Sequence, residues 1–336
     1  MPAPTDAYAA LAGVLKSCKS VLITTHVRPD GDALGTTAAV HLGLKQLGVS
    51  SECLLLSHLP AKYAFVYNDA HVLHYDFERG WPNAFDFDRF DALLVCDTGT
   101  WSQLPGLKDR VASFAKPKLV LDHHLTQEDW PTHHLVDKQA AAAAEVAHRL
   151  LFDHLGVTVT KDIATALYLG LCTDTGWFQF SNTSPHTMRL AARLMEAGVD
   201  TDRLYRLLYQ NERKERIALH ARAHASLELL HDGRLAVMTL GKQDFADTGA
   251  HVPDTENVVN FPLQIRTVEV ALLFTDPPEG GPIRVSLRSK GQVDVAALAA
   301  QFGGGGHARA AGCKVEGSHA LARERLSTAL LASLPV

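Results

Sequence analysis

Short apolar runs alternate with helical patterns through the first half of the chain, and this alternation restricts the fold more than any other feature. The runs SVLITTH, SECLLL, DALLVCD and KLVLDHH predict four buried strands. Between the first two, DALGTTAAVHLGLKQLG has apolar residues at helical spacing and ends at Gly48, a typical helix stop. Strand–helix–strand units of this kind build a parallel sheet with helices on both faces. We therefore expect an α/β fold.

The rest of the pattern predicts a second, smaller domain. The chain has 336 residues, 46% of them hydrophobic, which is enough for two cores. Three further helical patterns are followed by a long charged stretch, and then by the strand-like runs RLAVMTL, TVEVALLF and PIRVSLRS and the short helix DVAALAAQF. We expect a parallel-sheet domain over 1–195, a helical linker over 196–230 and a smaller α/β domain over 231–336.

Composition limits the partners and the compartment. A net charge of -5 and a pI near 6.4 argue against a surface that coats nucleic acid, so any nucleic-acid partner should be short. The five cysteines are scattered and form no CxxC pair, which is typical of core thiols in a reducing cytoplasm rather than of a disulfide scaffold or a zinc site. No segment approaches the roughly 20 apolar residues of a membrane span. We expect a soluble, cytoplasmic protein with no membrane partner.

Acidic and imidazole side chains recur where the first-half strands end. They are His26, Asp30, Asp32, Asp97, Asp122, His123, His124 and, after a later helix, Asp174. Singly, each has a structural explanation, such as a helix cap, a turn or a solvated surface. Together they should converge, because ligands of an open parallel sheet bind outside the carboxyl ends of its strands. Carboxylates crowded in this way repel one another unless cations neutralise them.

The donor types indicate which cation would bind. Carboxylates with imidazoles and no thiolate suit manganese or magnesium, and also admit cobalt or iron; zinc fits less well. Four carboxylates balance two divalent ions in formal charge, and such pairs lie about 3.5 to 4 Å apart in hydrolases. A pair of this kind activates water for attack on phosphorus, so no Ser or Cys nucleophile is required.

The motifs also carry a family resemblance. HVRPDGDALG, VCDTG, DHH and CTDTGWFQF resemble, in order, the four motifs of the DHH phosphoesterase superfamily. SLRSKGQVDVAALAAQFGGGGHARAAGCKV is similar to the DHH-associated substrate-binding domain, and the layout resembles the NrnA-type oligoribonucleases and pAp phosphatases. The resemblance implies an N-terminal DHH catalytic domain, a C-terminal α/β DHH-associated domain, a metal site in the cleft between them and a homodimer.

The resemblance further implies a role for each site residue. His26 and Asp30 would hold one ion, Asp32, His123 and Asp174 would hold the other, and Asp97 would bridge them. His124 would face the scissile phosphate, and Asp122 would orient the histidine pair. Asn257 stands where the family has Gly, although Asn also tolerates left-handed backbone angles.

The glycine-rich stretch GGGGHARAAG, 303–312, is the second candidate site. No Lys-Ser or Lys-Thr follows the glycines, so it is not a P-loop. Bare backbone N–H groups of Gly304, Gly305 and Gly306 could hold a phosphate. His307, Arg288 and Arg309 could add charge, and Arg288 is favoured by the resemblance. The alternative is a flexible linker.

The aromatic residues Trp177, Phe178 and Phe261 could stack on a nucleobase or pack in the core, and we favour packing in the core.

The expected function is hydrolysis, by water and two metal ions, of phosphoesters in short oligoribonucleotides and in 3′-phosphoadenosine 5′-phosphate (pAp). Manganese is the expected metal, with magnesium or cobalt as substitutes. Alternatives within the same chemistry are a phosphodiesterase acting on cyclic dinucleotides or their linear products, and a pyrophosphatase or exopolyphosphatase. A nucleotide-sensing protein that does not cleave would be expected to have lost metal ligands, and none is missing.

Overall fold

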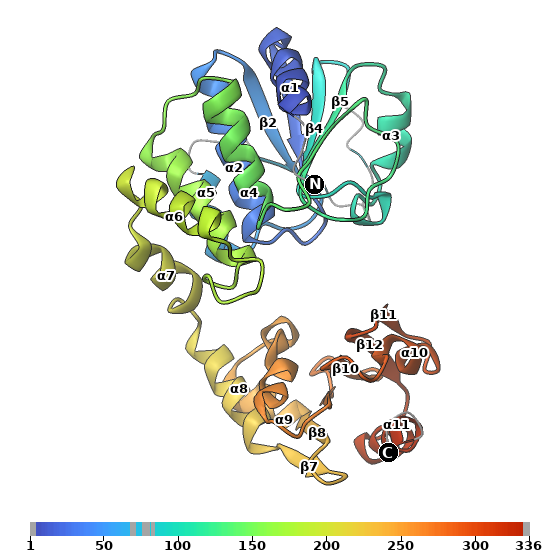
Figure 1. Cartoon of the computed structure of the whole chain (residues 1–336). Helices are drawn as coiled ribbons and strands as arrows, with labels where there is room; N and C mark the ends of the chain where they lie inside the picture. Colours follow the sequence, from blue (N-terminus) through green and yellow to red (C-terminus); the bar gives the residue numbers. More distant parts are fainter. Residues whose placement is uncertain (1–4, 68–71, 76–80, 82–84, 332–336) are drawn as a thin grey trace. The chain divides into compact units, whose positions relative to one another are not determined.

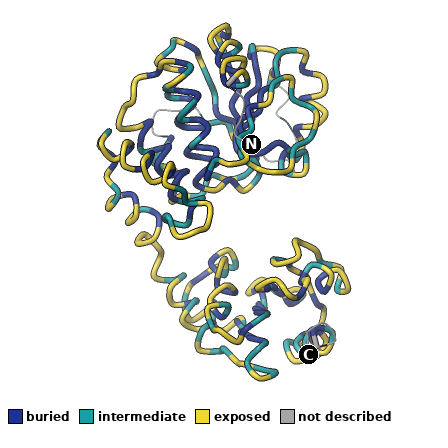
Figure 2. The backbone as a smooth tube through the Cα atoms, viewed as in Figure 1, coloured by how far each residue is buried: buried dark blue, intermediate teal, exposed yellow. Residues whose placement is uncertain are grey.

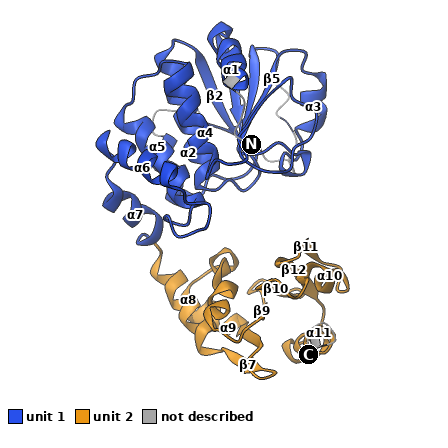
Figure 3. Ribbon diagram, viewed as in Figure 1, with its two compact units in different colours: residues 1–211 blue, residues 212–336 orange. Residues whose placement is uncertain are grey.

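The structure is a computed structural model that describes residues 5–67, 72–75, 81 and 85–331 (Figure 1). The chain forms two compact units, Met1–Asn211 and Glu212–Val336 (Figure 3). In each unit the buried residues follow the strands and the inward faces of the helices (Figure 2).

Unit 1 (Met1–Asn211) is built on a sheet whose described pairings are all parallel. Its order is β3-β2-β1-β4-β5-β6. The strands are β1 (Ser20–Thr24), β2 (Ser50–Leu55), β3 (Val72–His74), β4 (Ala92–Cys96), β5 (Lys118–Asp122) and β6 (His133–Val136). The four predicted strands β1, β2, β4 and β5 are confirmed. The two edge strands were not predicted, because three or four residues show too little alternation to stand out.

Helices cover both faces of this sheet, as expected. Along β1, Val21 and Ile23 belong to one core and Leu22 to the other, which is the period-two alternation of a strand buried on both sides. The elements of unit 1 besides the strands are α1 (Thr5–Ser17), α2 (Gly31–Gln46), η1 (Ala61–Tyr67), η2 (Trp101–Gln103), α3 (Lys108–Ser113), α4 (Ala143–Arg149), η3 (Leu150–His154), α5 (Lys161–Asp174), α6 (Pro185–Glu196) and α7 (Thr201–Tyr209). The first core contains α1, α2, α4 and α5, and the second contains α3 (Figure 1).

The segment expected to link the domains, 196–230, is divided between the units. Leu204 and Leu208 on α7 pack into the core of unit 1. Leu219 and Ala223 on α8 (Lys214–Ala225) pack into a core of unit 2. The apolar face of each helix therefore joins the unit beside it, and the division between the units falls between Asn211 and Glu212.

Unit 2 (Glu212–Val336) is a mixed sheet of order β11-β12-β10-β9-β8-β7, with β8 and β9 parallel and the other neighbours antiparallel. Its elements after α8 are β7 (Glu228–Leu230), β8 (Leu235–Leu240), α9 (Lys242–Thr248), η4 (Val252–Thr255), η5 (Val258–Gln264), β9 (Val270–Thr275), β10 (Ile283–Ser289), α10 (Val295–Ala300), β11 (Gly305–His307), β12 (Ala310–Val315) and α11 (His319–Leu331). Helices α10 and α11 pack on one face, and α8 and α9 on the other.

Two sequence-based expectations concern the whole chain. All five cysteines are free and buried, which confirms that they are core residues. None of the helices in the described part of the chain combines the length and the apolar character that crossing a membrane requires.

Helices α2 and α5 approach closely at Gly35. A Cβ added there would overlap the backbone oxygen of Ala166, and a backbone atom cannot move aside as a flexible side chain can. Gly13 on α1 is the opposite case, because a Cβ there meets nothing.

We predict opposite effects of alanine at these two glycines. Gly35→Ala should lower the free energy of unfolding by about 1 to 3 kcal/mol through overpacking. Gly13→Ala should raise it by up to about 1 kcal/mol, because the site is open and alanine favours the helix. All four tryptophans lie in unit 1, so urea denaturation followed by tryptophan fluorescence reports this unit. Equal effects of the two substitutions would contradict the close contact between α2 and α5.

Candidate metal centre

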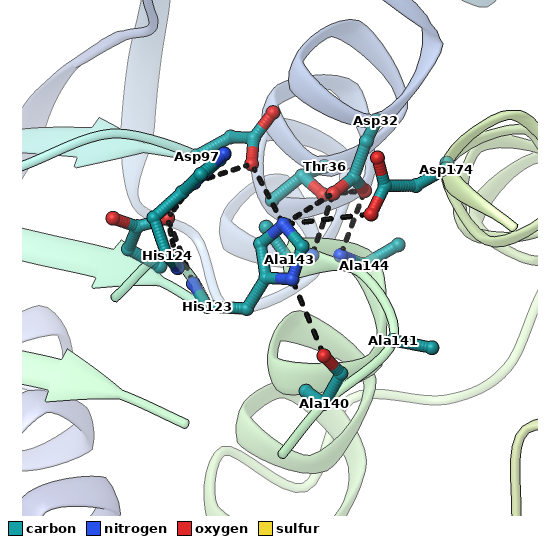
Figure 4. A network of polar contacts seen from close by, with 12 residues as sticks. Asp32, Thr36, Asp97, His123, His124, Ala140, Ala141, Ala143, Ala144 and Asp174 are labelled. Atoms are coloured by element: carbon teal, nitrogen blue, oxygen red, sulfur yellow. Dashed lines mark hydrogen bonds and ion pairs between the residues drawn. The ribbon is translucent and has the colours of Figure 1, made fainter. Parts of the chain in front are cut away.

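The strand ends of unit 1 bring the predicted ligands to one edge of the sheet. Asp97 directly follows β4, His123 and His124 follow β5, and Asp174 is the last residue of α5 (Figure 4). His26 follows β1, and Asp30 and Asp32 lie at the start of α2. Asp30 is also the N-cap of α2, where its Oδ1 accepts hydrogen bonds from the backbone N–H groups of Asp32 and Ala33, both at 3.0 Å.

Two groups of donors meet at Asp97. In the first, His26 Nε2 lies 4.0 Å from Asp30 Oδ1 and 3.6 Å from Asp97 Oδ2. In the second, His123 Nε2 lies 3.9 Å from Asp32 Oδ2 and 3.5 Å from Asp174 Oδ2. His123 Nε2 is also 3.5 Å from Asp97 Oδ1, so the two oxygens of Asp97 face different groups.

The backbone fixes which nitrogen each histidine presents. His26 Nδ1 lies 2.9 Å from the Val27 carbonyl oxygen, and His123 Nδ1 lies 3.2 Å from that of Ala140. A carbonyl only accepts, so each Nδ1 carries a hydrogen, and Nε2 is the nitrogen that faces the carboxylates and can bind a metal ion through its lone pair. Lone pairs and carboxylate oxygens repel one another, and a cation between them removes that repulsion.

Asp97 is buried between the two groups of donors. Its side chain is 3% exposed, and its Oδ1 has no hydrogen-bond donor among the described residues. Its φ is 61°, in the left-handed region, which costs a non-glycine residue about 1 kcal/mol. A buried carboxylate oxygen without a donor is unfavourable, and a metal ion would satisfy it. The residues present therefore fit a divalent cation.

Asp32 is held by the first turn of α4. Its Oδ2 accepts a 2.6 Å hydrogen bond from Ala143 N, and its Oδ1 accepts one of 3.0 Å from Ala144 N (Figure 4). These N–H groups have no partner within the helix, and the positive end of the helix dipole favours a carboxylate there. Gly170 on α5 makes room for it, because a Cβ at that position would lie 2.6 Å from Asp32 Oδ1.

Burial and mutual repulsion make ionisation of the carboxylates unfavourable and raise their pKa values. Burial, with repulsion from Asp174 and Asp30, raises the pKa of Asp32 to about 7. Burial and neighbouring carboxylates raise the pKa of Asp97 well above its ordinary value, and burial raises that of Asp174. Divalent ions reverse this effect, since they favour the ionised form of each carboxylate.

Asp122 and His124 form a separate pair beside this cluster. Asp122 Oδ1 lies 2.8 Å from His124 Nδ1 and also accepts from the backbone N–H of His123 and His124. Gln127 Nε2 donates to Asp122 Oδ2 at 2.5 Å. Burial alone would raise the pKa of Asp122, but these hydrogen bonds lower it, and the same contact raises the pKa of His124. His124 Nδ1 therefore hydrogen-bonds to Asp122 rather than to Asp97, whose Oδ1 lies 3.7 Å away.

A pocket of ≈ 680 Å³ opens beside these groups. Its lining includes His26, Asp30, Asp97, His124 and Asp174, together with hydroxyl-bearing residues. Every lining residue belongs to unit 1. The expectation that the metal site lies in a cleft between the two domains stays a prediction.

The glycine-rich stretch of unit 2 is a β-hairpin and not a flexible linker. Strand β11 pairs with β12, and a Cβ at Gly304 would overlap the Gly312 carbonyl oxygen. His307 and Arg288 are both register partners of Ala310, one from each side, so they share a face of the sheet. Gly305 and Gly306 are exposed on the edge strand. Burial lowers the pKa of Arg288, and Arg309 is exposed.

The aromatic candidates differ from one another. Trp177 and Phe178 are partly buried against the core of unit 1, in agreement with the expectation that they pack in the core. Phe261 is 41% exposed and stacks on His224 at 3.9 Å between ring centroids. Asn257 has a φ of 67°, so it adopts the left-handed conformation that was expected to suit it.

Some features of the site were not predicted from the sequence. They are Gln127, Gly170, the α4 N–H groups and Arg28, which lines the pocket. Arg28 lies inside the motif HVRPDGDALG, which was a signal available in the sequence. The other features depend on contacts between segments far apart in the chain.

Comparison with known proteins identifies the family. Residues 20–171 match the DHH family, N-terminal domain, and residues 232–332 match the DHHA1 domain. The bifunctional oligoribonuclease and PAP phosphatase NrnA of Thermus thermophilus is 33% identical over 319 residues, which cover 91% of this chain and 88% of that protein. The chain belongs to the DHH family. The match to NrnA and the two-domain layout confirm the predicted NrnA-type, DHH–DHHA1 organisation.

Solved structures show the same fold. A crystal structure of an exopolyphosphatase-related protein from Bacteroides fragilis has a TM-score of 0.84 at 23% identity, covering 98% of this chain and 97% of that chain. The exonuclease RecJ bound to manganese has a TM-score of 0.56 at 16% identity, covering 100% of this chain and 96% of that chain. This DHH protein therefore shares its fold with proteins whose names describe different activities.

We predict that Gly170→Ala weakens metal binding. The added methyl group would displace the Asp32 carboxylate from the position that α4 fixes, so affinity for manganese should fall by about 10- to 100-fold, as for other residues that orient metal ligands. The matched control is Gly43→Ala on α2, where an added Cβ meets the tip of Leu151. Calorimetric titration with manganese measures both. Unchanged affinity in Gly170→Ala would show that Asp32 does not need this position.

Proposed function

We propose that this DHH protein is a metal-dependent phosphoesterase that hydrolyses short oligoribonucleotides and pAp. The observation that carries the proposal is Asp97, a buried carboxylate whose unpartnered oxygen and its twin face two groups of donors beside an open pocket. The substrate class follows from the relative, which is named a bifunctional oligoribonuclease and PAP phosphatase and aligns with 91% of this chain.

Two divalent ions, most suitably Mn²⁺, are part of the proposal. His26 and Asp30 would hold one ion, and Asp32, His123 and Asp174 the other, with Asp97 shared. The donors are oxygen and imidazole nitrogen, which suit manganese and also accept Mg²⁺ or Co²⁺. RecJ, which has the same fold, was crystallised bound to manganese. When bound, such ions activate water and offset the charge that develops on the phosphoryl oxygens.

Other contacts within unit 1 orient the histidines of the site. The backbone carbonyls of Val27 and Ala140 hold His26 and His123 with Nε2 toward the carboxylates. His124 has a 55% exposed side chain that lines the pocket, and its Nδ1 is engaged by Asp122. Its raised pKa favours the protonated ring, whose Nε2–H can donate to the scissile phosphate or to the leaving oxygen.

Unit 2 is proposed to bind the substrate through the hairpin and Arg288. The face shared by Arg288 and His307 offers cationic and hydrogen-bonding groups, and the exposed edge strand that carries Gly305 and Gly306 can offer backbone N–H groups. Gly304 does not serve as expected, because its N–H donates a 2.9 Å hydrogen bond to the Ala299 carbonyl oxygen. A Cβ at Gly305 would meet no protein atom within 4 Å, so packing within unit 2 gives no reason for glycine there. Close approach of a ligand supplies one.

Oligomeric state and location complete the proposal. We infer a homodimer, as the family resemblance implies. We infer that the protein acts in the cytoplasm, because its five cysteines form no disulfide, as is usual in a reducing compartment.

The direct test is a hydrolysis assay with added Mn²⁺. We expect mononucleotides from di- to pentaribonucleotides and phosphate from pAp, with a cyclic dinucleotide, pyrophosphate and polyphosphate as the competing substrates. Asp97→Ala should lower kcat by at least about 100-fold, more than loss of a residue that only orients a ligand. Asp109→Ala, an exposed residue on α3, is the control and should keep full activity.

The outcomes separate the parts of the proposal. Turnover of only pyrophosphate or polyphosphate would keep the metal centre and contradict the substrate assignment. Turnover of only the cyclic dinucleotide would place the protein among the phosphodiesterases. Retained activity in Asp97→Ala would contradict the metal scheme.

In the same assay, Arg288→Gln should raise KM with little change in kcat, because Arg288 is proposed to bind the substrate and not to take part in the hydrolysis step.

A further inference from the structure

Arg28 is the one Arg or Lys among the residues that line the metal-site pocket in the described part of the chain. The same lining holds the carboxylates of Asp30, Asp97 and Asp174 and two histidines, His26 and His124. None of the proposed metal roles uses a guanidinium, because Arg carries its positive charge at all ordinary pH values and would repel a cation. The presence of Arg28 therefore needs a separate explanation.

The backbone holds Arg28 in a strained conformation. Its φ is 54°, in the left-handed region that a residue with a long side chain rarely adopts. Two hydrogen bonds, both 2.9 Å long, hold this turn: Arg28 N donates to Ser57 Oγ, and Val27 N donates to the Gln103 carbonyl oxygen. Strain of this kind persists where neighbouring segments enforce it, and it gathers at ligand sites.

The Arg28 side chain is exposed and forms no ion pair with any residue that the structure describes. Some other arginines of the chain do form ion pairs, for example Arg206 with Asp202 at 2.7 Å and Arg89 with Glu52 at 2.5 Å. Three neighbours of Arg28 on the pocket wall are carboxylates, yet none approaches its guanidinium within ion-pair distance. The guanidinium is therefore available to an anion that enters the pocket.

We propose that Arg28 binds a second phosphate group of the substrate, next to the phosphate that is hydrolysed. The inference rests on the proposed function. Two divalent ions would balance the four carboxylates of Asp30, Asp32, Asp97 and Asp174, so a substrate with two phosphates brings negative charge that the centre leaves unbalanced. A planar guanidinium suits a phosphate because it can donate two parallel hydrogen bonds. Arg28 is thus a specificity-determining residue that favours substrates with two phosphates over those with one.

The test compares pAp with adenosine 3′-monophosphate, which has the same 3′-phosphate and lacks the 5′-phosphate. Arg28→Gln should raise KM for pAp by about tenfold, as expected for loss of a charged hydrogen bond near solvent, and leave kcat within about twofold. KM for adenosine 3′-monophosphate should stay unchanged. Arg28→Lys keeps the charge and loses the fork, so its KM for pAp should lie between those of wild type and Arg28→Gln.

Two further measurements distinguish a phosphate contact from damage to the site. Manganese affinity, measured by calorimetric titration, should be equal in wild type and Arg28→Gln. Raising the salt concentration should raise the wild-type KM for pAp more steeply than that of Arg28→Gln, because screening weakens the contact that the variant lacks. The matched control is Arg110→Gln, an exposed arginine on α3 outside the pocket, which should behave as wild type.

Each outcome decides one point. Equal discrimination between the two substrates in wild type and Arg28→Gln would show that Arg28 is a solvated surface residue and would overturn this inference alone. An equal loss for both substrates, or weaker manganese binding, would assign Arg28 to the integrity of the metal centre and would also overturn it. A wild-type protein that hydrolyses neither substrate would overturn the proposed function and this inference with it.

Discussion

The carboxylates at the end of the first sheet repel one another, and the helices around them hold them together against that repulsion. Asp32 is 1% exposed and Asp97 is 3% exposed, and both lie within 4 Å of His123 Nε2. Burial raises the pKa of both carboxylates, which shows how unfavourable their charges are without a counter-ion. A chain that keeps such a cluster must gain from it elsewhere, and divalent cations are the simplest source of that gain.

The scaffold around the cluster is arranged to hold it in place. The first turn of α4 donates two N–H groups to Asp32, and Gly170 on α5 leaves the space that its carboxylate needs. Gly35 lets α2, which carries Asp32, pack directly on α5, which carries Asp174. The contact between α2 and α5 therefore contributes to the stability of unit 1 and also positions the proposed metal ligands, so a substitution in it affects both.

Much of this arrangement could be predicted from the sequence, because strand periodicity and the order of the motifs are local signals. Asp97 and His123 were expected at one sheet edge, and the structure brings them to 3.5 Å. Contacts between distant segments leave no local signal, so the support of Asp32 by α4, 111 residues away, was not predicted. The backbone angle of Arg28 was equally invisible, since nothing in its neighbours' identities requires a positive φ. The glycine-rich hairpin was recognised as a candidate phosphate site, whereas its strand pairing was not.

The number of manganese ions bound to the purified protein, and the coupling between them, would show whether Asp97 is shared by two ions. Metal analysis after equilibration gives the number of ions per chain, and low-temperature electron paramagnetic resonance shows whether they interact. We predict two ions per chain with an exchange-coupled spectrum, because one oxygen of Asp97 faces His26 and the other faces His123. A single ion, or two ions with uncoupled spectra, would contradict a shared carboxylate at the centre of the site.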